Sequence, residues 1–154
     1  MVLDAVNDAL SKANPERAAA KWSFVNVTTF NGIDPRDNEP FAYLSHFCSE
    51  GGGPAYYGRD GGHMWGCDST AGAHSTGDVE LVEFRAPLHI NKYELMPDSG
   101  SPGKWRGGLG SVMDVSIECD DCVITITGGG YRFAPASRLG GGSPNDQIHR
   151  LNKK

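Results

Sequence analysis

Short runs of glycine constrain the folding of this chain more than any other feature of its sequence. The chain holds 21 glycines in 154 residues, and the densest runs are Gly51-Gly52-Gly53, Gly61-Gly62 and Gly107-Gly108. Glycine destabilises the interior of helices and strands, but it permits positive φ angles and close approach between backbones. We therefore expect residues 51–77 to be mostly loop. We expect residues 107–110 to bring β elements into close contact.

The remaining composition is typical of a single folded domain spanning residues 1–154. Hydrophobic residues make up 38% and charged residues 21% of the chain, a balance that argues against disorder. The net charge of -5 argues against nucleic-acid binding, which needs a basic face. No apolar stretch approaches the roughly 20 residues of a membrane span, and the first residues do not resemble a signal peptide. We expect a cytoplasmic protein without membrane contact.

The first half of the chain carries signals for one helix and two strands. Residues 2–12 place apolar side chains at helical spacing and end before Pro15, since proline disfavours helical geometry in the preceding residue. Residues 22–30 and 40–47 are rich in β-branched and aromatic residues and predict strands. Turns are predicted between them, at Asn31-Gly32 and at residues 34–38.

In the second half, strands are predicted at residues 79–84, 88–95 and 112–117. Residues 119–122 read Cys-Asp-Asp-Cys and are followed by a further alternating run at residues 123–127. A two-residue connection between such runs is typical of a tight hairpin. The expected fold is α+β and β-rich: antiparallel strands and hairpins, one short N-terminal helix and long glycine-rich loops. Residues 132–145, punctuated by Gly and Pro, are expected to wrap a neighbour.

The cysteines are the candidate metal ligands. The four of them are Cys48, Cys67, Cys119 and Cys122. Two thiolates that flank a hairpin tip can both reach one zinc ion at about 2.3 Å, and the other two cysteines would close a structural, tetrahedral site. The alternative is four free thiols that behave as small hydrophobes. Three histidines are alternative ligands if one of the cysteines does not bind the metal: His46, His63 and His74.

No residue is predicted to be catalytic or to bind a cofactor. The acidic group consists of Asp78, Glu80, Glu83 and Glu94. At strand spacing Glu80 and Glu83 face opposite sides, which favours a solvated face or intersubunit ion pairs over acid–base catalysis. Residues 107–110 lack the Lys-Ser/Thr of a phosphate-binding loop and precede a strand. The tryptophans Trp22, Trp65 and Trp105 are predicted to pack in the core or an interface.

Several separate blocks, in the same order, resemble the hydantoinase B family. They are Gly32-Ile33-Asp34-Pro35-Arg36, Phe41-Ala42-Tyr43, Gly51-Gly52-Gly53, Gly58-Arg59-Asp60-Gly61, residues 93–110 and residues 140–144. The chain departs from that family at residues 67–76, where a Thr-Asn-Thr run is usual. Members of the family are several times longer, and their long N-terminal portion supplies much of the substrate and metal chemistry.

Within that family the chain resembles the small β subunit of acetophenone carboxylases. The resemblance implies a hetero-oligomeric ligase in which hydantoinase A-like subunits use ATP to activate a ketone and bicarbonate. A large hydantoinase B-like subunit would then carry out the carboxylation, and this chain would complete that subunit's fold without being catalytic alone. Two alternatives remain. One is a split subunit of an ATP-dependent hydantoinase or 5-oxoprolinase, and the other is a freestanding zinc-binding interaction module.

Overall fold

The computed structural model describes residues 2–20, 27–45, 51–65, 77–129 and 141–142. Within them the elements follow the order α1 (Val2–Ala13), the 3-10 turn η1 (Pro15–Arg17), β1 (Val27–Ile33), β2 (Pro40–Ser45), α2 (Val79–Arg85), β3 (Leu88–Leu95), β4 (Ser111–Ile117) and β5 (Val123–Thr127). The predicted β-rich α+β class is confirmed, with a second short helix that the sequence did not indicate. No described helix has the length and apolar character that crossing a membrane requires.

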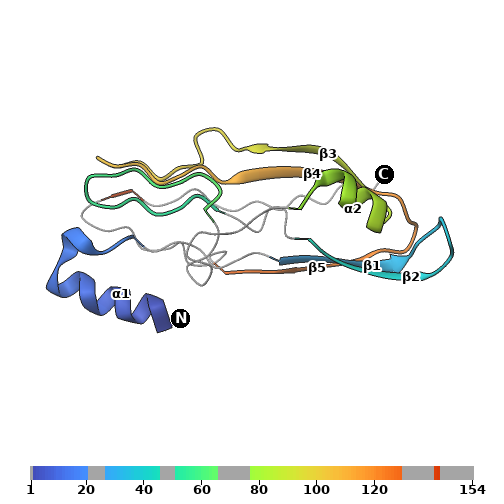
Figure 1. The fold of residues 1–154 in the computed structure, drawn as a ribbon, viewed down its shortest axis with the longest axis horizontal. Coiled ribbons are helices and arrows are strands. Elements are labelled where there is room, and N and C mark those ends of the chain that lie inside the picture. The colour runs from blue at the N-terminus through green and yellow to red at the C-terminus, as the bar shows by residue number, and fades with distance from the viewer. Residues whose placement is uncertain (1, 21–26, 46–50, 66–76, 130–140, 143–154) are drawn as a thin grey trace.

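The strands form two antiparallel sheets that lie as two layers, with α2 at one end between them (Figure 1). One sheet has the order β2-β1-β5 and the other pairs β3 with β4. Phe30 lies at the centre of the first sheet, paired with Tyr43 on one side and Ile124 on the other. It packs in a small buried cluster with Val82, Ala86 and Leu88, so the core lies where α2 meets both sheets.

The strand predicted at residues 79–84 is wrong, because these residues form helix α2. The Asp78 side chain caps the N-terminus by accepting a hydrogen bond from the backbone N–H of Glu80 at 3.2 Å. Val79 and Val82, three residues apart, then lie on the same helical face and pack in the core. A local cap and a helical core contact therefore override the β-branched composition of this segment.

The predicted hairpin at residues 119–122 is also contradicted. β4 pairs with β3 and β5 pairs with β1, so the turn carries the chain from one sheet to the other (Figure 1). The predicted turn at Asn31-Gly32 is likewise wrong, because both residues lie within β1 and pair with Ala42 and Phe41. In the first case the strand partners lie far along the chain, which a local turn signal does not encode. In the second case the reversal between β1 and β2 comes later, at residues 34–39.

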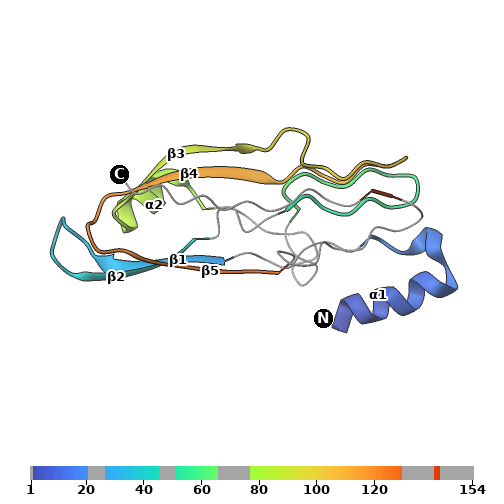
Figure 2. The same cartoon turned by 180° about the vertical axis from the view of Figure 1, so that it is seen from behind.

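Helix α1 is confirmed close to its predicted bounds and lies away from the core, near the other end of the molecule (Figures 1 and 2). A hydrogen bond of 3.2 Å from the Asn7 side-chain amide to the Ala19 carbonyl ties it to the segment that follows. Val6 and Leu10 remain 49% and 60% exposed, so part of its apolar stripe is uncovered.

Candidate functional site

The turn between β4 and β5 holds one half of the predicted metal site. Cys119 and Cys122 are free thiols, each partly exposed. Burial raises the pKa of Cys119 to about 11, and Cys122 adds to the shift through its charge and a hydrogen bond. Gly32 in β1 makes room for this turn: a Cβ there would lie 2.7 Å from the Asp121 carbonyl oxygen and 3.5 Å from the Cys119 Sγ. The turn therefore brings two thiols together over a strand position that lacks a side chain.

The other predicted ligands divide into two groups. Cys48, Cys67, His46 and His74 lie outside the described residues. His63 belongs to the segment 51–65, which lies at the opposite end of the molecule from the turn at residues 118–122 (Figure 1). There its Nδ1 accepts a hydrogen bond of 2.9 Å from the Leu109 N–H, so it is no partner for Cys119 and Cys122. Among the described residues no three His, Cys, Asp or Glu side chains gather as a metal site would require.

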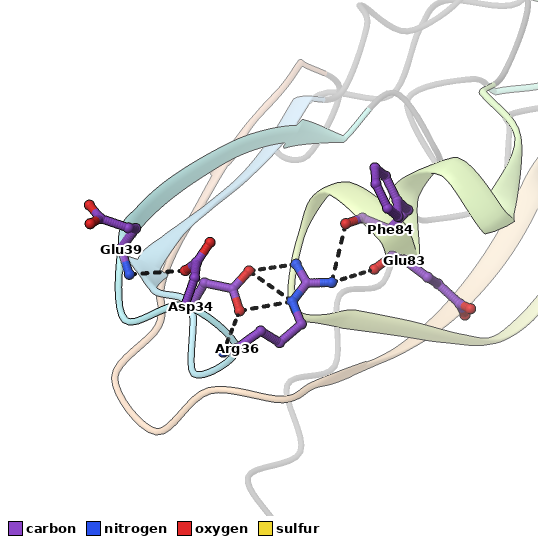
Figure 3. Close-up of polar contacts among 6 residues, drawn as sticks. Asp34, Arg36, Glu39, Glu83 and Phe84 are labelled. Carbon is purple, nitrogen blue, oxygen red and sulfur yellow. Dashed lines mark hydrogen bonds and ion pairs between the residues drawn. The ribbon is translucent and has the colours of Figure 1, made fainter.

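A second constellation joins the turn after β1 to helix α2 (Figure 3). The Arg36 Nε donates to both carboxylate oxygens of Asp34, at 2.9 and 3.0 Å. Its Nη1 donates to the carbonyl oxygens of Glu83 and Phe84, at 3.0 and 3.2 Å. The hydrogen bonds from Arg36 hold the pKa of Asp34 below its ordinary value. Arg36 thus caps the carbonyl end of α2, where a cation is favoured by the helix dipole.

The sequence placed Asp34-Pro35-Arg36 in a turn and in a family block, but it did not reveal this role. The partners of Arg36 are backbone carbonyls of a helix that the sequence predicted as a strand. A signal was nevertheless present. An Asp and an Arg flanking a proline in one turn can form a bidentate pair, which positions the guanidinium for further bonds.

The glycine-rich segments pack backbone against backbone. A Cβ on Gly52 would lie 1.7 Å from the Gly108 carbonyl oxygen, and a Cβ on Gly108 would lie 1.8 Å from that of Gly62. Main-chain bonds join the same segments, from Gly53 N to Gly62 O at 2.8 Å and from Gly108 N to Gly53 O at 2.9 Å. Among the described glycines only Gly58 has a positive φ, of 83°. Glycine was expected to provide positive φ angles and close contact between backbones. Close contact therefore predominates.

The packed glycine segments, residues 51–53, 61–62 and 107–110, are called the glycine layer below. Side chains of the family blocks hold this layer in place. The Asp60 carboxylate accepts from the Arg106 N–H at 2.8 Å, and the Ser99 hydroxyl accepts from the Gly110 N–H at 2.9 Å. Trp65 lies across the glycines, since a Cβ on Gly62 would be 2.3 Å from its ring. These contacts give the polar residues of the blocks a scaffolding role in which backbone N–H groups are satisfied.

An aromatic and basic cluster stands on the loops beside the glycine layer. The rings of Tyr57 and Trp105 have centroids 4.7 Å apart, and the Lys104 ammonium lies 4.8 Å from the Trp105 ring centroid. Tyr57 is 52% exposed. Trp105 is partly buried and contacts the Tyr57 ring, and its packing in the core or in an interface stays a prediction.

Two acidic residues, Glu83 of α2 and Glu94 of β3, have local partners. The Glu83 carboxylate accepts from the Ile90 N–H at 2.8 Å and lies 3.0 Å from the His89 Nδ1. Glu94 forms an ion pair with Lys92 at 2.7 Å. Because α2 is helical, Glu80 and Glu83 are not on opposite sides as strand spacing implied. The side-chain contacts of Glu83 and Glu94 described here are therefore within the chain.

Comparison with known proteins identifies the family of this chain. The hydantoinase B/oxoprolinase family model matches residues 1–153. The β subunit of caprolactamase from Pseudomonas jessenii is 37% identical over 139 residues, which are 89% of this chain and 24% of that subunit. A D-/L-hydantoinase component of the B type, from Pseudomonas sp. strain NS671, is 32% identical over 87% of this chain and 22% of its own length.

Two solved structures share the fold. The crystal structure of ATP-dependent caprolactamase from Pseudomonas jessenii matches with a TM-score of 0.59 and 36% identity, over 71% of this chain and 19% of that chain. The nucleotide-free structure of acetone carboxylase matches with a TM-score of 0.61 and 23% identity, over 78% of this chain and 16% of that chain. This chain spans 24% and 22% of the length of the two curated relatives. It belongs to the hydantoinase B/oxoprolinase family.

Proposed function

We propose that this chain is part of an ATP-dependent enzyme complex that opens cyclic amides, in which it completes the fold of the hydantoinase B-type subunit. The observation that carries the proposal is the 37% identity to the caprolactamase β subunit over 89% of the chain. The solved caprolactamase, at 36% identity, supports the same assignment. Hydantoinase A-like subunits that bind ATP are the proposed partners, and the assembly is a hetero-oligomer.

The described residues support a scaffolding part rather than a catalytic one. The candidate polar side chains bind backbone groups: Arg36 the α2 carbonyls, Asp60 the Arg106 N–H and His63 the Leu109 N–H. In the described part of the chain six hydrophobic residues are buried, whereas eleven large ones are exposed. A domain with so small a core gains stability when a partner covers its remaining apolar surface.

Ketone carboxylation, the function that the sequence favoured, is the second candidate. It is supported by the fold shared with acetone carboxylase, at a TM-score of 0.61. At 23% identity that likeness concerns the fold alone, whereas the caprolactamase likeness extends to sequence. In this version the complex joins bicarbonate to a ketone at the expense of ATP, as in the acetophenone carboxylases.

The two candidates are separated by assaying the intact assembly, purified with its large subunits. Caprolactam, hydantoin and 5-oxoproline are each compared with acetone and acetophenone plus bicarbonate, and nucleotide hydrolysis is measured in every case. Nucleotide hydrolysis stimulated by a cyclic amide and accompanied by ring opening supports the first proposal. Stimulation by a ketone that depends on bicarbonate supports the second. An assembly without any ATP-hydrolysing subunit contradicts both candidate functions. It favours the third reading, a freestanding zinc-binding interaction module.

The zinc site at Cys48, Cys67, Cys119 and Cys122 is also a proposal. Two of these thiols meet at the crossover turn, and thiolates are the ligands that structural zinc prefers. Elemental analysis of the assembly should find one zinc per copy of this chain, and the Cys119→Ser/Cys122→Ser variant should lose it. An unchanged zinc content in that variant rules the site out, and no zinc in the wild type supports four free thiols.

We place the complex in the cytoplasm, where ATP is available and thiols stay reduced.

A further inference from the structure

The aromatic and basic cluster beside the glycine layer forms one accessible surface. Its six residues come from two loops, residues 56–60 and 104–106, and they are Tyr56, Tyr57, Arg59, Lys104, Trp105 and Arg106. The Tyr57 and Trp105 ring centroids lie 4.7 Å apart, and the Lys104 ammonium lies over the Trp105 ring. All of these residues except Trp105 are exposed. Aromatic and cationic groups are therefore presented together to a binding partner.

Hydrogen bonds fix the two loops against each other. The Gly61 N–H donates to the Arg106 carbonyl oxygen at 2.8 Å, and the Arg106 N–H donates to the Asp60 carboxylate at 2.8 Å. Within the first loop Tyr56 and Arg59 exchange two backbone hydrogen bonds, of 2.9 and 3.2 Å. A surface that is held in place before binding loses less conformational entropy when a partner docks on it.

The cluster carries positive charge that the described part of the chain does not neutralise. Its three cationic side chains form no ion pair with any described carboxylate, whereas Lys92 on β3 is paired with Glu94. The two loops contain one acidic residue, Asp60, whose carboxylate accepts from a backbone N–H. Three cations and one carboxylate leave a local charge of +2 in a chain whose net charge is -5. The cluster therefore favours a partner that supplies negative charge.

A small cleft beside the cluster limits what the partner can insert. It has a volume of about 120 Å³ and is lined by Tyr56, Arg59, Asp60, Gly62 and Trp65. Pockets for small molecules usually enclose about 300–1,000 Å³, so this cleft fits a single side chain. Because Asp60 already accepts a hydrogen bond, Arg59 is the charged group at the cleft wall that remains to be paired. A planar guanidinium can bind a carboxylate through two parallel hydrogen bonds.

The residue types of the cluster favour a polypeptide partner. Tyr, Trp and Arg are the side chains that contribute most to binding at protein–protein interfaces. A nucleic acid is disfavoured because the chain as a whole is acidic, and repulsion from phosphates extends beyond three local cations.

We propose that this cluster is the docking surface for an acidic polypeptide segment of another subunit, which places a carboxylate against Arg59 and packs on Tyr57 and Trp105. Charge complementarity of this kind sets the rate of association and the choice of partner more than the affinity. The inference rests on the hetero-oligomer of the proposed function, and it identifies a surface and a partner chemistry that the proposed function leaves open.

Carbodiimide coupling in the intact assembly tests the partner. The reagent joins a lysine to a carboxylate in contact with it through an amide bond, and mass spectrometry identifies the joined peptides. Lys104 should couple to an Asp or Glu of another subunit. Lys92 lies 2.7 Å from the Glu94 carboxylate, so it should couple within the chain and shows that the reaction has worked. If Lys92 couples and Lys104 does not, or if Lys104 couples only to this same chain, the proposal is overturned.

Charge reversal supplies an independent test. Arg59→Glu should weaken retention of the chain in the assembly by about tenfold or more, and retention should become less sensitive to salt, which screens attraction between exposed charges. Arg85→Glu is the matched control, because it changes the net charge equally on α2, at the opposite end of the molecule (Figure 1), and should leave retention unchanged. Hydrogen exchange at the Gly53 and Gly108 N–H groups, which bond within the glycine layer, shows whether Arg59→Glu remains folded there. Equal retention of both variants refutes the surface.

Three outcomes separate this inference from the function on which it rests. An assembly that opens cyclic amides, but shows neither the Lys104 coupling nor the Arg59→Glu defect, supports the function and refutes the surface. Nucleic acid that copurifies with the wild type and not with Arg59→Glu overturns the docking of a polypeptide. A wild-type chain that copurifies with no other subunit refutes the proposed function, and this docking with it.

Discussion

The two ends of this molecule are packed in different ways. Around α2 the contacts are between side chains: Phe30, Val82 and Leu88 are each at most 3% exposed and belong to one buried cluster. In the glycine layer Gly52, Gly61 and Gly108 pack against other backbone, and carbonyl oxygens lie where their Cβ atoms would be. A side-chain core tolerates volume changes by shifting rotamers, whereas a backbone contact has no rotamer to shift. The glycine layer is therefore the less tolerant end.

The largest expected effect is that of Gly108→Ala. Its Cβ would lie 1.8 Å from the Gly62 carbonyl oxygen and 2.5 Å from the carbonyl carbon, both fixed backbone atoms. We expect a loss of more than about 4 kcal/mol in the free energy of unfolding, in the range reserved for severe disruption. The measurement is urea denaturation of the purified protein. Gly110→Ala is the matched control, because its nearest neighbour would be 3.8 Å away. Equal midpoints for the two variants contradict backbone packing.

Phe30→Ala probes the side-chain end and should rank second. Phe30 is 2% exposed and pairs with residues on both neighbouring strands. Truncating a buried phenylalanine leaves a cavity and costs about 3 kcal/mol or slightly more. Val123→Ala, at a position that is 65% exposed, should change stability by less than about 0.5 kcal/mol. If Phe30→Ala destabilises more than Gly108→Ala in the same urea assay, the ranking of the two ends is reversed.

Arg36→Lys should have a smaller and more local effect. Lysine cannot reproduce the planar fork that binds the Asp34 carboxylate and two α2 carbonyls together. Hydrogen exchange should increase at the C-terminal turn of α2 and at the N-terminus of β3, with little change in the glycine layer. Arg59→Lys provides the control within the glycine-rich end. Unchanged exchange at α2 in Arg36→Lys shows that the helix does not need this cap.

The smallest effect is a pH dependence that Asp34 contributes. Its folded pKa lies below the ordinary value of 3.8, so the ionised form is favoured by folding. The stability difference between the wild type and Asp34→Asn should be constant above about pH 5, where the carboxyl is ionised in both the folded and unfolded chains. It should shrink as the pH falls through 3.8 and then through the folded pKa, where the carboxyl is protonated. Denaturation midpoints collected across this acid range measure it. If the stability difference persists unchanged at the lowest pH, it arises from the shape of the Asp34 side chain and not from its charge.

Much of the fold was predictable from local patterns. The helical spacing of residues 2–12 predicted α1, and the alternating runs predicted β3 and β4 with nearly their observed bounds. The turn at residues 34–38 was also predicted, and Asn38 adopts a positive φ of 62° there. These elements are determined by neighbouring residues, which is why a single sequence is informative about them.

The candidate site was less predictable. The cysteine spacing indicated that Cys119 and Cys122 lie together, and the structure places their turn beside Gly32. The role of Arg36 was not predictable. It depends on α2 being a helix, and on its docking against a turn that is distant in sequence.

By itself the sequence determined the family, the α+β class and the need for a glycine-only contact, because these follow from residue types and short spacings. The tertiary structure alone decided which strands pair, and hence that the cysteine turn links two sheets. It also decided that residues 79–85 form a helix. The physical reason is that backbone N–H and C=O groups are the same in almost every residue, so backbone hydrogen bonds do not specify which strands pair. The partner of a strand is therefore chosen by the core that long-range packing assembles.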